Sequence, residues 1–314
     1  MIFVGLSTFA KESREPLDLL EASGFPFRLH GTGKRITGPE LLESAQDADV
    51  IVAGVESYNA ALLDQLPSLR CLSRCGVGVD AIDLKHAKSR GVTVANTPEI
   101  PANAVAELAL AMFLSLSRNL PLQTHLMSQK RWERVSSHLI MGRTIGLVGL
   151  GRIGRRVAEL SKSFGAEVVA CDPAVNKETV EKLGIKLVSF GKLLEISDIV
   201  SIHASKVGTD SCLVGAKEFA SMKKGSILVN LARGDMVDES ALLQALESSH
   251  LSAAGLDVYP SEPYHGRLCE LPQVLLTPHS ATLPFETRVS MEKQSIQNAI
   301  DFLNGKLNPE HQVC

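Results

Sequence analysis

The sequence predicts an α/β protein made of two doubly wound, parallel-sheet domains. Three observations support this prediction. The chain has 314 residues, which is long for a single hydrophobic core. Apolar runs of strand length alternate with helical patterns in two separate series. A glycine-rich turn, Gly149-x-Gly151-x-x-Gly154, joins an apolar run to a helical pattern in the second series.

The first series occupies residues 1 to about 97. Gly24, Gly54 and Gly91 punctuate its elements, as glycine does where a helix or strand ends. Alternation of this kind predicts a parallel sheet covered by helices on both faces. The predicted strands are Ile2–Leu6, Phe27–His30, Val50–Gly54, Leu69–Cys75 and Val92–Asn96, and the predicted helices are Glu12–Ser23, Pro39–Ala45, Ala60–Leu66 and Leu84–Arg90.

A long, mainly apolar helix is predicted at Pro101–Asn119. It carries a stripe at helical spacing, mostly of small residues, which predicts close packing along this face: Ala104, Leu108, Ala111 and Ser115. The polar segment 123–141 follows and holds the only tryptophan, Trp132. This segment is either a surface arm with one anchoring aromatic or a contact between subunits.

The glycine turn begins the second series. It lies between an apolar run that ends at Val148 and a helical pattern that Gly165 ends, and the next apolar run finishes at Asp172. A glycine triplet in this setting, with an acid about twenty residues on, is typical of dinucleotide binding. Its glycines permit a tight turn, a close approach to a pyrophosphate and a helix packed near the strand.

The second series continues to the end of the chain. Its further strands are predicted at Ile185–Val188, Ile199–Ala204, Ile227–Ala232, Ala253–Val258 and Val274–Thr277, with helices at Gly191–Ile196, Gly215–Met222 and Ser240–Glu247. The last segment, Phe285–Gly305, predicts a helix that returns the chain to the first domain. We therefore expect one domain at 1–98 plus 286–314 and the other at 99–285.

Three polar residues follow strands of the second series, where ligands of open α/β sheets collect. Arg233 comes directly after a strand, and a guanidinium suits bidentate capture of a carboxylate. His279 can give or take a proton near neutral pH, and Glu262 can pair with that imidazole and favour its charged form. Beside a nicotinamide, a carboxylate clamp and an acid–base group are what 2-keto acid reduction needs.

At these residues the sequence resembles the D-isomer-specific 2-hydroxyacid dehydrogenases, and among them the short phosphoglycerate-dehydrogenase-like members. The matching motifs are Arg74-Cys-Gly-Val-Gly-Val-Asp80, Val105-Ala-Glu107, the glycine turn, Asn230-Leu-Ala-Arg-Gly234, Leu256-Asp-Val-Tyr-Pro-Ser-Glu-Pro263 and Thr277-Pro-His279. The resemblance implies a flavodoxin-like substrate domain with a Rossmann NAD-binding domain inserted into it. Ala53 stands where phosphoglycerate dehydrogenases commonly carry an arginine for the substrate phosphate, which argues against phosphoglycerate itself.

The resemblance also implies a role for each matching residue. Arg233 would bind the substrate, His279 would be the acid–base residue, and Glu262 would be its partner. Val77 and Gly78 would hold the substrate carboxylate through their backbone N–H groups, and Arg233 and His279 complete the expected substrate-binding residues. Asp172 favours NAD over NADP because a carboxylate repels a 2′-phosphate. The expected cofactor-binding residues are Gly149, Gly151, Arg152, Ile153, Gly154, Asp172, Ala204, Leu231, Ala232, Arg233, Asp257, His279 and Ala281, with Asp257 near the carboxamide.

The expected function is reversible hydride transfer between NAD(H) and a small 2-keto or 2-hydroxy acid, with a phosphoglycerate-, hydroxypyruvate- or glyoxylate-like substrate. An NAD(H)-sensing binding protein of the corepressor type, or an enzyme of the same fold that oxidises phosphite or formate, remains an alternative. A net charge of −3 argues against nucleic acid and anionic membranes as partners. Six cysteines without paired metal spacing indicate a cytoplasmic protein with no metal site. The resemblance also implies a homodimer that pairs through the NAD-binding domain.

Overall fold

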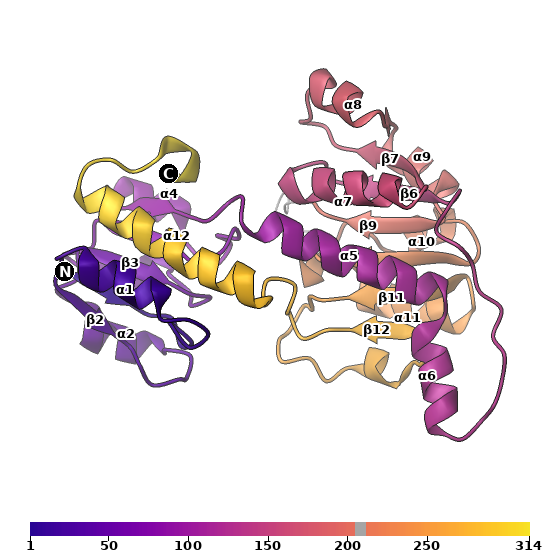
Figure 1. Ribbon diagram of the computed structural model, residues 1–314, viewed down its shortest axis with the longest axis horizontal. Coiled ribbons are helices and arrows are strands. Elements are labelled where there is room, and N and C mark those ends of the chain that lie inside the picture. The colour runs from indigo at the N-terminus through magenta and orange to yellow at the C-terminus, as the bar shows by residue number, and fades with distance from the viewer. Residues whose placement is uncertain (205–211) are drawn as a thin grey trace. The chain divides into compact units, whose positions relative to one another are not determined.

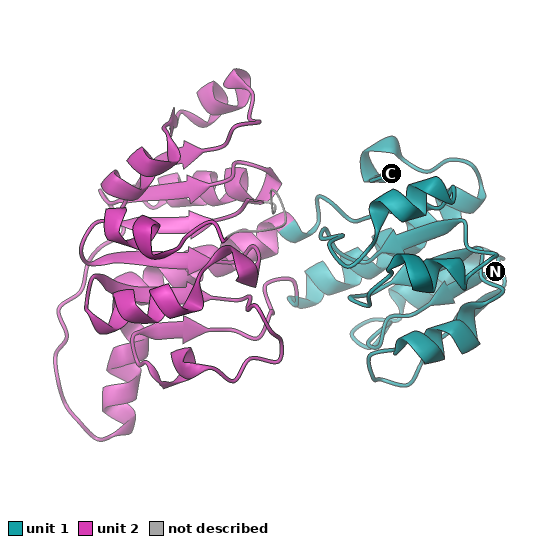
Figure 2. Cartoon of the chain, turned by 180° about the vertical axis from the view of Figure 1, so that it is seen from behind, with its two compact units in different colours: residues 1–101, 283–314 teal, residues 102–282 magenta. Residues whose placement is uncertain are grey.

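The computed structural model describes residues 1–204 and 212–314. The chain forms two compact units, which we call unit 1 (Met1–Pro101 with Leu283–Cys314) and unit 2 (Ala102–Thr282) (Figure 2). Each unit is built on one parallel sheet with helices on its faces (Figure 1). The predicted fold class, two doubly wound α/β domains, is therefore confirmed.

Unit 1 contains a five-stranded parallel sheet in the order β2-β1-β3-β4-β5. This order is the flavodoxin-like one, in which the strand sequence reverses between β1 and β3. The strands are β1 (Ile2–Val4), β2 (Phe27–Leu29), β3 (Val50–Ala53), β4 (Cys71–Arg74) and β5 (Thr93–Ala95), and the helices are α1 (Glu15–Ala22), α2 (Gly38–Ala45), α3 (Ala60–Asp64), α4 (Leu84–Ser89) and α12 (Phe285–Leu303).

The central strands of unit 1 are apolar on both faces because helices cover both sides of the sheet. Phe3 and Ile51 point into one core, whereas Val4 and Val52 point into the other. α12 packs on the second face, next to α1, and contributes Ile296 to that core (Figure 1). Burial on both faces explains why these strands read as continuous apolar runs and not as alternating ones.

Unit 2 contains a seven-stranded parallel sheet in the order β12-β11-β10-β9-β6-β7-β8, so the strand sequence reverses between β6 and β9. Ligands of such sheets bind beyond the carboxyl ends of the strands at this reversal. The strands are β6 (Thr144–Val148), β7 (Glu167–Cys171), β8 (Lys186–Leu187), β9 (Ile199–Ile202), β10 (Ser226–Asn230), β11 (Leu251–Leu256) and β12 (Val274–Leu276). The helices are α5 (Pro101–Ser117), α6 (Leu120–Ser128), α7 (Arg152–Ser163), α8 (Lys177–Leu183), α9 (Phe190–Ile196), α10 (Ala216–Ser221) and α11 (Glu239–Glu247).

The long helix α5 packs closely on the sheet of unit 2, through a face that coincides only in part with the predicted stripe. Ala109, Met112 and Phe113 are fully buried, whereas Ala111 of the predicted stripe is exposed. The close approach comes from the sheet, because a Cβ on Gly255 would lie 3.0 Å from the Met112 sulfur. The prediction of close packing was right, and the predicted face was right only at Ala104, which is buried, and Leu108, which packs against the core.

Within the described residues, no helix by itself has both the length and the apolar composition needed to cross a bilayer. α5 and α6 meet those criteria only when taken together, and the pair is bent by 62°. The segment after α6 leaves several apolar side chains on the surface, with Trp132 81% exposed and Leu139 and Met141 about two-thirds exposed.

Candidate active site

The glycine turn lies at the reversal point of the unit 2 sheet, between β6 and α7. Gly149 has a φ of +96°, and a Cβ there would lie 2.6 Å from the backbone nitrogen of Ala204. A Cβ on Gly154 would lie 2.2 Å from the Gly149 carbonyl oxygen. Packing within the protein therefore requires glycine at both positions.

Gly151 differs from its two neighbours because a Cβ there would meet nothing within 4 Å. No protein contact requires glycine at this position, so the open space it leaves is available to a ligand. Gly151 also caps the 12-residue helix α7, which begins at Arg152 without a side-chain cap. The N–H groups of a helix start bind anions, and the turn fits a pyrophosphate. Ile153 packs its side chain against the core.

Asp172, directly after β7, ties the glycine turn to the neighbouring strand. One carboxylate oxygen accepts a hydrogen bond from the Leu150 backbone at 2.7 Å, and the other accepts from Ala174 at 2.8 Å. Asp172 is thus fixed at the carboxyl end of β7, where the sequence predicts a contact with the adenosine ribose. Ala204, after β9, packs against Gly149. Both roles toward the cofactor stay predictions.

Replacing Gly149 with alanine is expected to destabilise the protein and weaken NADH binding. The new Cβ would meet the Ala204 backbone in a left-handed conformation, so we expect a loss of about 2–4 kcal/mol in unfolding free energy. NADH Kd should rise at least about tenfold, because the turn must shift to relieve the contact. Urea unfolding and fluorescence titration with NADH measure the two effects.

Gly191→Ala is the matched control for this variant. Gly191 lies in α9, its φ is negative, and a Cβ there would meet nothing within 4 Å. Alanine should leave stability unchanged or raise it by up to about 1 kcal/mol. Equal stability of the two variants would contradict the packing argument.

Below the glycine turn, His203 follows β9 and has its imidazole inside the protein. Its Nε2 lies 2.8 Å from the Ser201 hydroxyl, and its Nδ1 is buried without a hydrogen-bond partner among the described residues. Loss of hydration lowers the pKa of His203 to about 4. The imidazole is therefore neutral beneath the turn at physiological pH.

This buried imidazole predicts a specific loss of stability in acid. Between pH 6.5 and about 4 the unfolded chain binds a proton at His203 that the folded chain does not. Unfolding free energy should therefore fall by up to about 3 kcal/mol as the pH drops through this window. His203→Gln should remove that part of the pH dependence, and the exposed His138→Gln should not. Denaturant unfolding of all three proteins at pH 7 and about pH 4.5 tests this.

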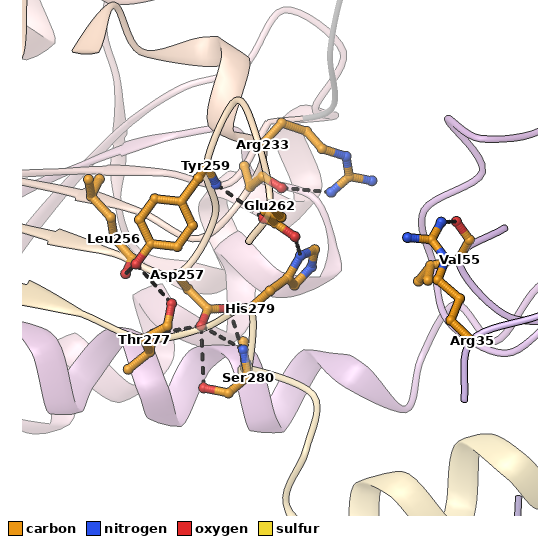
Figure 3. A network of polar contacts seen from close by, with 12 residues as sticks. Arg35, Val55, Arg233, Leu256, Asp257, Tyr259, Glu262, Thr277, His279 and Ser280 are labelled. Carbon is orange, nitrogen blue, oxygen red and sulfur yellow. Dashed lines mark hydrogen bonds and ion pairs between the residues drawn. The ribbon is translucent and has the colours of Figure 1, made fainter. Parts of the chain in front are cut away.

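Arg233, Glu262 and His279 follow three different strands of unit 2 and lie together at the edge of its sheet (Figure 3). The His279 Nδ1 lies 2.9 Å from a Glu262 carboxylate oxygen. With Nδ1–H donated to Glu262, Nε2 is left to exchange a proton with a substrate. This pairing is the one that the sequence predicted, and the catalytic roles of the three residues stay predictions.

The turn that carries Arg233 is fixed by Asn230, the last residue of β10. Its side chain accepts a hydrogen bond from the Ala232 backbone at 3.0 Å and donates to the Arg233 carbonyl at 2.8 Å. Leu231 and Ala232 are buried, as is Ala281, and their contacts with the cofactor stay predictions. The guanidinium of Arg233 donates to the Ala232 carbonyl oxygen at 2.7 Å.

Asp257 anchors the loop that carries His279. One of its oxygens accepts from the Thr277 hydroxyl at 2.6 Å and from the Ser280 backbone at 2.8 Å, and the other accepts from the Ala281 backbone at 3.1 Å. The Asp257 carbonyl also accepts from the His279 N–H at 2.9 Å. These bonds hold His279 at a φ of +50°, a left-handed conformation that histidine rarely adopts. The predicted contact of Asp257 with the carboxamide stays a prediction.

Unit 1 carries the remaining predicted residues, Val77 and Gly78, in the loop after β4. The Asn96 side chain donates to the Val77 carbonyl at 2.9 Å, which fixes this loop within unit 1. Unit 1 also holds a cation that sequence reasoning missed. The Arg35 guanidinium donates to the Val55 carbonyl at 2.6 Å, two residues beyond β3 and close in sequence to Ala53 (Figure 3).

Within the described chain, no group of three His, Cys, Asp or Glu side chains is arranged to hold a metal ion. A glycine turn at the reversal of a parallel sheet, with Arg, Glu and His at the strand ends beside it, is the construction of a dinucleotide-dependent dehydrogenase.

Comparison with known proteins identifies the family. Residues 110–281, just over half of the chain, match the model described as D-isomer specific 2-hydroxyacid dehydrogenase, NAD binding domain. The chain belongs to the D-isomer specific 2-hydroxyacid dehydrogenase family, which confirms the resemblance found in the sequence. The matched residues lie in unit 2, so NAD is the cofactor of this protein.

Individual relatives support the same assignment. The chain is 37% identical over 294 residues to D-3-phosphoglycerate dehydrogenase of Mycobacterium tuberculosis, covering 88% of this chain and 56% of that protein. It is 34% identical over 280 residues to glyoxylate reductase of Thermococcus litoralis, covering 86% and 85%. A solved glyoxylate reductase structure from Paecilomyes thermophila has a TM-score of 0.88 and 29% identity, covering 99% of this chain and 97% of the other. The chain thus spans only about half the length of the phosphoglycerate dehydrogenases it matches.

Proposed function

We propose that this protein is an NAD-dependent D-2-hydroxyacid dehydrogenase that interconverts a small 2-keto acid and its 2-hydroxy acid. The observation that carries the proposal is the His279–Glu262 pair, at 2.9 Å, lying with Arg233 at the edge of the sheet that holds the glycine turn. An acid–base group, its partner and a carboxylate clamp are the side chains that this reaction requires. Unit 2 is proposed to bind NAD.

NADH, held at the glycine turn, would supply the hydride that reduces the keto carbon. Arg233 holds the substrate carboxylate and stabilises negative charge as it develops on the keto oxygen. His279 donates the Nε2 proton to that oxygen, which completes the hydroxyl group. Glu262 accepts the Nδ1–H hydrogen bond and stabilises the charged imidazole before the transfer. In the direction of oxidation, His279 takes the hydroxyl proton as hydride leaves the carbon.

The substrate class includes glyoxylate, hydroxypyruvate and phosphorylated keto acids. Ala53 lacks the guanidinium that phosphoglycerate dehydrogenases commonly carry near this strand end. The Arg35 guanidinium instead bonds to the carbonyl of Val55, two residues after Ala53. Phosphohydroxypyruvate therefore belongs in any substrate panel.

The test is NADH oxidation with glyoxylate, hydroxypyruvate, pyruvate, phosphohydroxypyruvate and longer 2-keto acids. Turnover of at least one of them is expected, with the D-isomer as the product wherever the hydroxy acid is chiral. Binding of NADH without turnover of any keto acid would overturn the proposal and favour the NAD(H)-sensing alternative.

We also propose that the protein is a homodimer that pairs through unit 2. The exposed apolar side chains of α6 and the segment after it support this, since Met127, Trp132 and Met141 are each more than half exposed. Sedimentation analysis should give twice the monomer mass, and Trp132→Glu should shift it toward the monomer. A monomeric wild-type protein at micromolar concentration would contradict the proposal.

A further inference from the structure

Two tyrosines flank the loop that presents Glu262. The rings of Tyr259 and Tyr264 stack with centroids 4.4 Å apart and planes inclined by 16°. Both rings pack against the core cluster that contains Leu242 and Leu268. The stack therefore closes the base of the segment 260–263 and fixes its two ends against the core.

Tyr264, one ring of the stack, is bonded to the neighbouring helix α11. The Tyr264 hydroxyl donates to the carboxylate of Glu239, the first residue of α11, at 2.7 Å. It also accepts a hydrogen bond from the Leu268 backbone. Burial and the Glu239 carboxylate both raise the pKa of Tyr264, so its hydroxyl remains a donor across the neutral range.

Tyr259 contacts the segments that carry all three candidate catalytic residues, the His279 segment through its ring hydroxyl and the other two through its backbone. Its hydroxyl donates to the Thr277 carbonyl at 2.9 Å, two residues before His279 (Figure 3). Its backbone N–H donates to Glu262 at 3.2 Å. Its carbonyl carbon is so close to Gly234, the residue after Arg233, that a Cβ there would lie 1.9 Å away.

The Glu262–His279 pair needs such support because it is open to water. The two side chains are 37% and 53% exposed, and an exposed ion pair holds its own geometry only weakly. Its 2.9 Å separation must therefore be set by the backbones of two loops 17 residues apart in sequence. Tyr259 bonds to both of those loops.

We propose that the Tyr259–Tyr264 stack is a positioning element that holds the Glu262 loop and the His279 loop at the separation their hydrogen bond requires. The inference rests on the proposed function, since the pair matters for turnover only if His279 exchanges a proton with the substrate. Tyr264 acts through Tyr259, and Tyr259 acts through Glu262 and Thr277, so the role of the stack is positioning and not catalysis.

The first experiment compares Tyr264→Ala, which removes the stack, with Tyr264→Phe, which keeps the ring. The alanine variant should lower kcat for the preferred keto acid about tenfold, because a misplaced acid–base group slows proton transfer. Its Kd for NADH should stay within about twofold of the wild-type value, and Tyr264→Phe should keep most of kcat. Phe190→Ala, at a partly buried aromatic packed on the same core cluster, is the matched control and should retain kcat.

A second measurement separates positioning from a general loss of structure. In a Glu262→Gln background, Tyr264→Ala should cause little further loss, because the stack acts through that carboxylate. The full tenfold loss in that background would overturn the proposal, as would an unchanged kcat in folded Tyr264→Ala. Tyr264→Leu replaces the alanine variant if the latter does not fold.

The imidazole of His279 gives a readout that does not depend on turnover. Nitrogen chemical shifts report which ring nitrogen carries the proton, and pairing with Glu262 fixes it on Nδ1. Tyr264→Ala should alter these shifts, whereas Phe190→Ala should not. Unchanged chemical shifts in Tyr264→Ala would overturn the positioning role, even if the protein reduces no keto acid. Altered shifts in a protein without turnover would support the positioning role and reject only the proposed function.

Discussion

Replacing His279 with glutamine is expected to lower kcat/KM for keto acid reduction by about 10²- to 10⁴-fold, the usual contribution of a general acid. Glutamine can still hydrogen-bond to the keto oxygen, but it has no proton to give up near neutral pH. The proton that completes the hydroxyl group must then come from water. Steady-state NADH oxidation with the preferred keto acid measures the loss.

Two further variants show whether the loss belongs to the acid–base step. Glu262→Gln keeps the hydrogen bond to Nδ1 without the charge, so a smaller loss of about tenfold is expected. His138→Gln removes an exposed imidazole from the same unit and should retain full activity. Activity of His279→Gln above a tenth of the wild-type value, with NADH binding intact, would exclude His279 as the proton donor.

The central strands could be predicted from the sequence because they are buried on both faces of their sheets, unlike the largely exposed edge strands β2 and β8. The predicted strand ends were less accurate for the same reason. Leu69 and Cys75 belong to the predicted run Leu69–Cys75 and are buried, yet both lie outside β4, Cys71–Arg74. An apolar run reports burial, whereas a strand is defined by backbone pairing.

Two helices were missed because they bury almost nothing. α8, Lys177–Leu183, has no buried residue, and α6 buries only Leu126. Without a periodic apolar face, only capping could have revealed α8. Asn176 accepts a hydrogen bond from Thr179 at its start, and Gly184 ends it in a left-handed conformation.

The grouping of the candidate site residues was predictable from the sequence, whereas the hydrogen bonds that support them were not. Arg233, Glu262 and His279 were predicted because polar residues that follow parallel strands converge at one sheet edge. His279 has a left-handed backbone conformation. The bonds that hold its loop come from Asp257, about twenty positions earlier in the sequence. Tyr259 bonds to Thr277 at a similar separation. No local pattern encodes such pairings, so they required the structure.

Replacing Arg233 with alanine is expected to lower kcat/KM by about 10³-fold, equivalent to about 4 kcal/mol of transition-state stabilisation. The side chain is proposed to hold the carboxylate and to stabilise charge on the keto oxygen, and alanine removes both interactions. Arg233→Lys keeps the charge but lacks the planar fork, so a loss of about 10²-fold is expected. Guanidinium ion added to the alanine variant should restore part of the rate, because the vacated space accepts the same donor group.

Arg267→Ala removes an exposed arginine that pairs with Glu247 in the same unit, and it should keep wild-type kinetics. Full activity of Arg233→Ala on any accepted keto acid would remove the carboxylate clamp from the mechanism.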